Sequence, residues 1–134
     1  MTDVWIAGAG MTRFGRHEAD LPDLMAEAGR AALAAAGIER PEVVVVAAMN
    51  PEEFVGEGAF ASRIATYLGF SRTPSFRVET ATSSGAAAIF SGFTAIASGL
   101  YRSVLVVGGE KMTHLPTPRV SELISRTIDP HERS

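Results

Sequence analysis

Runs of apolar residues, some continuous and some alternating with polar ones, predict the strands of this chain. Residues 42–48 contain four consecutive valines, a pattern typical of a strand that is covered on both faces of a sheet. A second, nearly continuous apolar run at 103–107 predicts another such strand. Between them, residues 76–79 alternate apolar and polar side chains, and Val4 to Ala7 predicts a first short strand near the N-terminus.

Helical periodicity fills the stretches between these strands. Apolar residues recur every three to four positions from 21 to 35, where Asp20 is placed to cap a helix and Gly37 to end it. The same spacing from 60 to 68, followed by Gly69, predicts a second helix. Strands that alternate with helices predict an α/β fold, here with a parallel or mostly parallel mixed sheet and helices on both of its faces.

The chain is organised around a longer helix, predicted from about Ser83 to Tyr101. It is rich in glycine and alanine, and two glycines inside it cost on the order of 1 kcal/mol each relative to alanine. Such a sequence favours close packing on every side, so we expect a buried central helix. Its start holds Thr82, Ser83 and Ser84, whose hydroxyl oxygens can accept hydrogen bonds from the free N–H groups of the first turn. We therefore expect the positive end of this helix to face something polar.

The composition of the 134 residues fits one folded domain. Hydrophobic residues make up 46% and charged residues 20%, which excludes a disordered chain. A net charge of −3 gives no electrostatic footprint for nucleic acid, and no apolar run reaches the roughly 20 residues that a membrane span needs. No signal peptide is visible, so we expect a cytoplasmic protein. Cysteine is absent, which excludes disulfides, thiolate zinc sites and a cysteine nucleophile.

Neither a nucleotide cofactor nor a metal ion is predicted. Gly8-Ala9-Gly10 resembles the opening of a dinucleotide-binding fingerprint, but Arg13 stands where the third glycine should be. A turn at the exit of a strand is therefore the favoured interpretation. Asp129, His131 and Glu132 lie close together in the sequence, but their spacing fits no strong metal-binding motif.

Three stretches of the chain, taken together, resemble one known family. They are Trp5 to Gly15, Val78 to Gly85, and Val106 to Thr113. In this order and spacing they are similar to the N-terminal half of thiolases, most of all the sterol-carrier-protein-linked thiolases and their bacterial thiolase-like relatives. The resemblance covers essentially the whole chain. It implies a layered α/β half, residues 1–113, that packs helix to helix against a second half, with 114–134 as the start of a loop excursion that shapes the acyl-CoA pocket.

The resemblance also places the family's reactive cysteine at Thr82. Family members that carry the thiolase reaction have Glu-x-Ala-Cys-Ala-Ser-Gly at this turn, and Ser84 and Gly85 match its last two residues. A cysteine is useful there because the helix dipole stabilises its thiolate. A threonine hydroxyl gains almost nothing from the same field and needs an adjacent base. Thr82 is therefore interpreted as a helix cap in preference to a nucleophile.

Other residues near the ends of the predicted strands are candidates for contact with the substrate. Ser83 lies beside Thr82, and Met112 and His114 follow the 103–107 strand, where family members approach the pocket. Met112 has the alternative of filling the core, and His114 that of lying on a surface loop. The adjacent pair Glu110 and Lys111 is interpreted as a solvated pair at the strand exit.

The resemblance implies chemistry on acyl-CoA and leaves three functions open. The first is a lyase or aldolase that cleaves or forms C–C bonds by a retro-aldol type of reaction, with coenzyme A present only as part of the substrate. The second is a non-catalytic, pseudo-thiolase scaffold. The third is a thiolase acyltransferase in which Thr82 replaces the cysteine, natively or by engineering. The family's activating histidine lies in its C-terminal half, so we expect a C-terminal half or partner subunit to complete the chain, in a dimer or hetero-oligomer.

Overall fold

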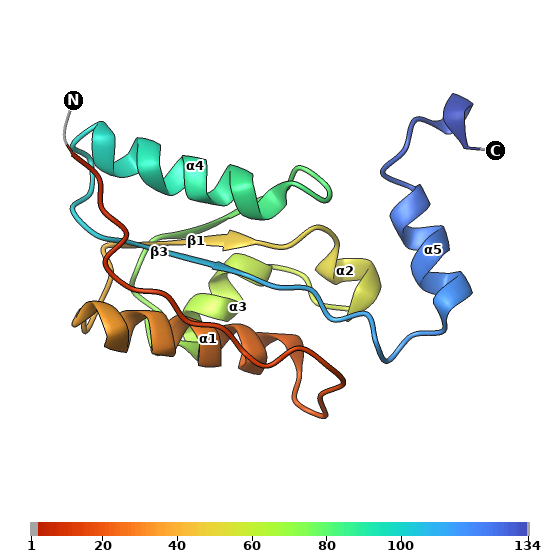
Figure 1. Ribbon diagram of the computed structural model, residues 1–134, viewed down its shortest axis with the longest axis horizontal. Coiled ribbons are helices and arrows are strands. Elements are labelled where there is room, and N and C mark those ends of the chain that lie inside the picture. The colour runs from red at the N-terminus through yellow and green to blue at the C-terminus, as the bar shows by residue number, and fades with distance from the viewer. Residues whose placement is uncertain (1–2, 134) are drawn as a thin grey trace.

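The structure is a three-layered α/β arrangement built on a short parallel sheet. The computed structural model describes residues 3–133. Its sheet has the order β2-β1-β3, formed by β1 (Val43–Ala47), β2 (Ser75–Val78) and β3 (Val104–Gly108), and both neighbours run parallel to β1. Helices cover both faces of this sheet (Figure 1). The predicted α/β class and parallel sheet are confirmed.

The central strand β1 is buried along its whole length. It pairs with a neighbour on each side, so that Val45 lies opposite Phe76 of β2 and Val106 of β3. Its side chains alternate between the two faces, and both faces carry helices, which explains why every position is apolar. The four valines therefore predicted the strand and its cover on both faces correctly.

Two helices cover one face of the sheet. They are α1 (Leu21–Ala36) and α3 (Phe60–Tyr67), which pack on Val44 and Val46 of β1 in the larger apolar core. Gly37 ends α1 with a φ of 66°, in the left-handed region that glycine adopts most readily. Both helices lie close to their predicted bounds because their apolar periodicity matches a single buried face.

The opposite face carries α4 (Ser84–Ala97), the helix that the sequence places at the centre of the fold. Its small residues at a spacing of four, Ser84, Ala88 and Gly92, are buried against the sheet. The side chains of Ile89, Phe90 and Phe93 are 59%, 68% and 42% exposed. The helix is thus covered on one side within this chain, and the predicted cover on its outer side is not found among the described residues.

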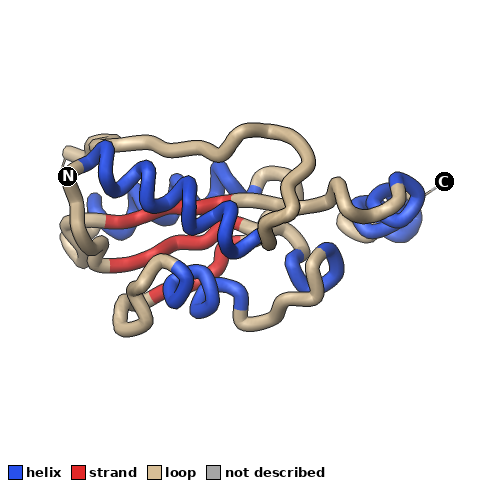
Figure 2. Tube along the Cα trace, turned by 90° about the horizontal axis from the view of Figure 1, so that it is seen from below, coloured by secondary structure: helices blue, strands red, loops and turns tan. Residues whose placement is uncertain are grey.

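The predicted strand at Val4 to Ala7 is wrong. This segment forms no ladder with the sheet. The chain that follows it, from Gly8 on, runs along α1 (Figures 1 and 2). A Cβ at Gly8 would lie 2.5 Å from the carbonyl oxygen of Ala32, so the two backbones are in direct contact. Most of Val4 to Ala7 is exposed, and only the glycines after it pack on a helix, so its apolar composition does not lead to strand pairing here.

The C-terminal part folds back on a short helix that follows β1. Leu123 of α5 (Thr117–Ser125) is fully buried, and α5 packs on α2 (Pro51–Phe54). A final 3-10 turn spans Pro130–Glu132. The division of the chain at residue 113 stays a prediction, although α5 already finds a partner within this chain.

A network of exposed ion pairs joins α2 to α5. Glu53 of α2 lies 2.7 Å from the guanidinium of Arg126 and 3.3 Å from that of Arg119, and both arginines also pair with Glu122. Hydrogen bonds from Arg119 and then Arg126 lower the pKa of Glu122. Because the folded state holds this carboxylate in its ionised form, the contribution is present above the usual carboxyl pKa and is lost as the pH falls through the lowered pKa.

Replacing Glu53 with glutamine should loosen α5 without affecting the sheet. Exposed ion pairs are individually weak, so amide hydrogen exchange in 117–125 should accelerate only a few-fold, while exchange in β1 stays unchanged. Glu57→Gln breaks an exposed pair with Arg63 elsewhere and serves as the control. Equal exchange of α5 in the two variants would show that Leu123, and not the ion network, holds this helix.

Candidate functional site

The ends of all three strands meet at one edge of the sheet. Because the strands are parallel, their carboxyl ends lead into three neighbouring segments: 48–50 after β1, 79–83 after β2 and 109–114 after β3. Figure 1 shows these segments at the edge that also faces α2. In open α/β sheets this is the edge where ligands bind. Every residue that the sequence indicates for a site lies in these segments.

Thr82 lies in a tight turn between β2 and α4. Ala81, just before it, has a φ of +52°, a left-handed conformation that is uncommon for a residue with a side chain. The carboxylate of Glu79 accepts a hydrogen bond from the N–H of Ala81. The hydroxyl of Ser84 accepts from the N–H of Thr80 at 2.9 Å and donates to the carbonyl of Ala81 at 2.6 Å. These bonds hold the turn in a shape that leaves Thr82 exposed.

The hydroxyl groups of the turn do not cap α4 as predicted. Ser83 stands at the N-cap position without a side-chain cap, and its hydroxyl donates to the carbonyl of Thr80 at 2.7 Å. No hydrogen bond of the Thr82 side chain is found among the described residues, so the predicted cap role of Thr82 is wrong. The start of α4 therefore has no side-chain cap and directly follows an exposed threonine. N–H groups that stay free in the first turn of a helix can stabilise a negatively charged oxygen.

Met112 and His114 contact segments of the chain other than the Thr82 turn. The ring Nε2 of His114 lies 2.9 Å from the carbonyl oxygen of Phe54, which ties the segment after β3 to α2. Met112 is half-buried and lines a cavity of about 370 Å³. This cavity lies between the N-terminal segment 10–17, the start of α1 and residues 108–113, so it brings together two of the three stretches that carry the family resemblance. Whether these side chains contact substrate stays a prediction.

The surroundings of Glu110 differ from the solvated position that the sequence indicated. Its side-chain oxygen Oε2 accepts a hydrogen bond from the N–H of Met49 at 2.8 Å, and its Oε1 is buried with no partner among residues 3–133. Burial raises the pKa of this carboxyl, whereas the backbone N–H groups of Met49 and Asn50 act in the opposite direction. Lys111 donates instead to the carbonyl of Ala19 at 2.7 Å. Glu110 is therefore not solvated as predicted, whereas the bond of Lys111 lies at the surface.

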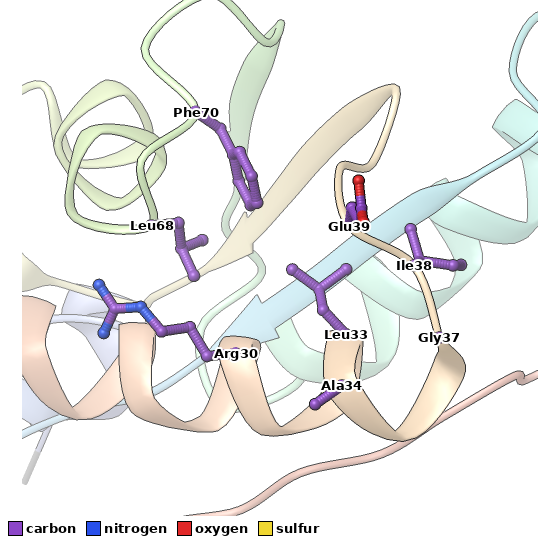
Figure 3. A pocket seen from close by; sticks show the side chains of 8 residues that line it. All are labelled: Arg30, Leu33, Ala34, Gly37, Ile38, Glu39, Leu68 and Phe70. Atoms are coloured by element: carbon purple, nitrogen blue, oxygen red, sulfur yellow. The ribbon is translucent and has the colours of Figure 1, made fainter.

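A larger cavity lies at the opposite edge of the sheet. It measures about 580 Å³ and is lined by the C-terminal end of α1, the residues that lead into β1, and the segment after α3. Figure 3 shows Leu33, Leu68 and Phe70 pointing into it, with Arg30 and Glu39 beside them. It contains none of the segments that follow the strands, so it is separate from the candidate site.

Residues 3–133 contain neither a membrane-spanning helix nor a cluster of metal-binding side chains. No helix in this part of the chain is long and apolar enough to cross a membrane. Within the same residues, no group of three or more histidine, aspartate or glutamate side chains could hold a metal ion.

Comparison with known proteins agrees with the geometry. Residues 4–133 match the family described as the thiolase N-terminal domain. The chain is 36% identical to an acetyl-CoA acetyltransferase from Methanothermobacter thermautotrophicus over 90% of its own length and 33% of that protein. It is 33% identical to sterol carrier protein 2 from Bos taurus over 96% of its length and 24% of that protein. The chain thus spans about a third or less of the curated relatives it matches.

A solved structure gives the same picture of the fold. The 3-oxoacyl-(acyl carrier protein) synthase III from Pseudomonas aeruginosa superimposes on 75% of this chain and 31% of its own, with a TM-score of 0.63 and 33% sequence identity. The layered arrangement and the parallel sheet are therefore shared with an enzyme whose name places it in acyl-chain chemistry.

Proposed function

Because the chain belongs to the thiolase family and matches its N-terminal domain, we propose that it is part of an enzyme that cleaves or forms C–C bonds in acyl-CoA substrates without a cysteine acyl-enzyme. The observation that carries this proposal is the exposed Thr82 at the uncapped start of α4, in a chain that contains no cysteine. The proposed reaction is of the retro-aldol type, acting on a β-hydroxyacyl thioester.

The uncapped start of α4 supports such a reaction in physical terms. In a retro-aldol cleavage, a base removes the proton of the β-hydroxyl group, the bond between Cα and Cβ breaks, and the electron pair passes to the thioester as an enolate. The enolate then takes a proton at Cα. Free N–H groups at the positive end of a helix stabilise the enolate oxygen, and no covalent bond to the protein is required. The side chains of the Thr82 turn form their hydrogen bonds with other residues of the same turn. The base is therefore provided by a group outside this turn.

Replacing Thr82 with alanine tests the proposal most directly. In the assembled protein, cleavage of β-hydroxyacyl-CoA should stay within about threefold of the native rate, because no intermediate passes through the hydroxyl. A threonine nucleophile would instead lose roughly 10⁴-fold or more on the same change. Stability should also change little, since the Thr82 side chain caps no helix N–H group. The matched control is Thr66→Ala on α3, which removes an exposed threonine hydroxyl far from the site.

A cysteine variant extends this test to the electrostatics of the turn. In Thr82→Cys, the open start of α4 should lower the thiol pKa, so iodoacetamide should label residue 82 at neutral pH faster than a free thiol of ordinary reactivity. Loss of acyl-CoA cleavage in Thr82→Ala, together with a trapped acyl group on residue 82 of the native protein, would replace the proposal with acyl transfer through threonine.

The outer face of α4 favours a second candidate, a scaffold role in a larger assembly. Helix positions 86, 89, 90 and 93 form one stripe, and the large apolar residues in it are exposed. We propose that a C-terminal half or a partner subunit covers this stripe, in either function. In a pure scaffold, Thr82→Ala and Thr82→Cys would both leave the activity of the assembly unchanged, and substrate would not protect residue 82 from labelling.

A further inference from the structure

Glu110 occupies an unusual position for a carboxylate. It follows the two glycines that end β3, and its side chain reaches across to the loop that leaves β1, where Oε2 accepts the N–H of Met49 at 2.8 Å. The other oxygen, Oε1, is buried and has no partner in the described part of the chain. A buried acceptor without a partner costs free energy, and native proteins retain such groups mostly where they have a role.

The charged groups around Glu110 do not explain its presence. Arg77 of β2 and Glu52 of α2 both face it, but they pair with each other at 2.7 Å and act on its pKa in opposite directions. Lys111 bonds to Ala19, and among residues 3–133 no ion pair involves Glu110. A glutamine could accept the same hydrogen bond from Met49 without burying a charge. Stability alone therefore does not favour a glutamate here.

The loop that Glu110 holds is connected to both parts of the candidate site. Met49 and Asn50 lead directly into α2. Within α2, Glu52 binds Arg77, which lies on the strand that enters the Thr82 turn. The carbonyl of Phe54, at the end of α2, contacts the ring of His114. Anchoring the start of α2 therefore also restrains the segment after β2, through the pair of Glu52 and Arg77, and the segment after β3, through His114.

We propose that Glu110 is a positioning residue of the candidate site, which anchors the start of α2 and through it the Thr82 turn and His114. It acts through α2 and does not touch the substrate, because its unpartnered oxygen is buried. The expected effect on catalysis rests on the proposed function, whereas the anchoring of α2 does not.

The test compares Glu110→Gln and Glu110→Ala in the assembled protein, with Glu27→Gln on the exposed side of α1 as the control. Burial raises the folded-state pKa of Glu110, so its favourable contribution is complete below the usual carboxyl pKa and is lost as the pH rises through the raised pKa. Glu110→Gln avoids this loss, and its unfolding temperature relative to the native protein should therefore be higher at pH 8 than at pH 4. In spite of this, the neutral amide forms a weaker hydrogen bond with the N–H of Met49 than a carboxylate does, so kcat of Glu110→Gln should fall about threefold. Glu110→Ala removes the acceptor, so its kcat should fall about tenfold or more, with KM little changed in both variants.

Amide hydrogen exchange separates this inference from the proposed function. In Glu110→Ala, exchange in 49–54 and 80–84 should accelerate at least about tenfold, while the Glu27→Gln control stays at the native rate. If the native assembly cleaves no acyl-CoA but this acceleration is seen, the proposed function fails and the anchoring role stands. Native exchange in Glu110→Ala overturns the inference. A native kcat in Glu110→Ala also overturns it, because the anchor of α2 would then have no role in the site.

Discussion

Replacing Phe90 with glutamate is expected to abolish assembly of the protein while leaving the fold of this chain intact. Phe90 is 68% exposed on the outer face of α4, so its loss removes no contact with the sheet. If another half or subunit covers this face, burial of the phenylalanine contributes about 1.5–3 kcal/mol, and an unpaired carboxylate in its place adds a larger penalty. Together these effects weaken association by a factor of more than about 100. Native mass spectrometry at several concentrations measures the result.

Ile128→Glu is the matched control for this experiment. Ile128 is also a large apolar residue, 45% exposed, but it lies beyond α5 and outside the stripe on α4. The same change of charge there should leave the assembly intact. Dissociation in both variants would show that any added charge disrupts it, and assembly of Phe90→Glu at native concentrations would show that the outer face of α4 is not the covered surface.

The parts of the fold that could be predicted from the sequence are those decided by local patterns. The valines of β1 require apolar surroundings on both faces, and the structure provides them. Gly37 and Gly69 end their helices in the left-handed conformation, with φ values of 66° and 87°. In each case the side chains that decide the structure lie within one element and its immediate neighbours.

The features that were missed depend on contacts between distant segments. Val4 to Ala7 has the composition of a strand, but it joins no strand of the sheet, and the glycines that follow it pack on α1. A glutamate next to a lysine is typical of a protein surface, but the hydrogen-bond partner of Glu110, Met49, lies 61 positions away in the chain. The cap predicted for Thr82 failed for a local reason instead, since Ser83 and Ser84 form their hydrogen bonds within the turn itself.

The prediction of a buried central helix is met on one face of α4 and unmet on the other. Its small residues did indicate close packing, and the stripe of Ser84, Ala88 and Gly92 packs on the sheet. Its large residues, Ile89, Phe90 and Phe93, indicate a second packed surface that the described chain does not supply. The sequence therefore carries information about a contact that this chain alone cannot form.

A bulky residue at Gly92 should have the largest effect on the stability of the chain itself. A Cβ at this position would lie 2.9 Å from Cγ2 of Val106 and 3.4 Å from Cγ1 of Val104, so α4 lies almost directly on β3. Gly92→Ala gains about 1 kcal/mol of helix propensity but must displace the end of the Val106 side chain, so its net effect should be small. Gly92→Leu cannot be accommodated in the same way and should lower the free energy of unfolding by roughly 1–3 kcal/mol.

Gly85 supplies the control because it lies on the same helix, and a Cβ added to it would meet nothing within 4 Å among the described residues. Gly85→Ala should raise the free energy of unfolding by up to about 1 kcal/mol. Denaturant unfolding of the three variants separates the cases, since Gly85→Ala changes the helix without a contact to β3, whereas both changes at Gly92 act on that contact. If Gly92→Leu unfolds at the native denaturant concentration, α4 is not seated on β3 as the structure shows. A loss confined to Gly92→Leu instead means that the close approach at Gly92 helps to seat α4 on β3, and α4 in turn carries the Thr82 turn at its start and the apolar stripe on its outer face.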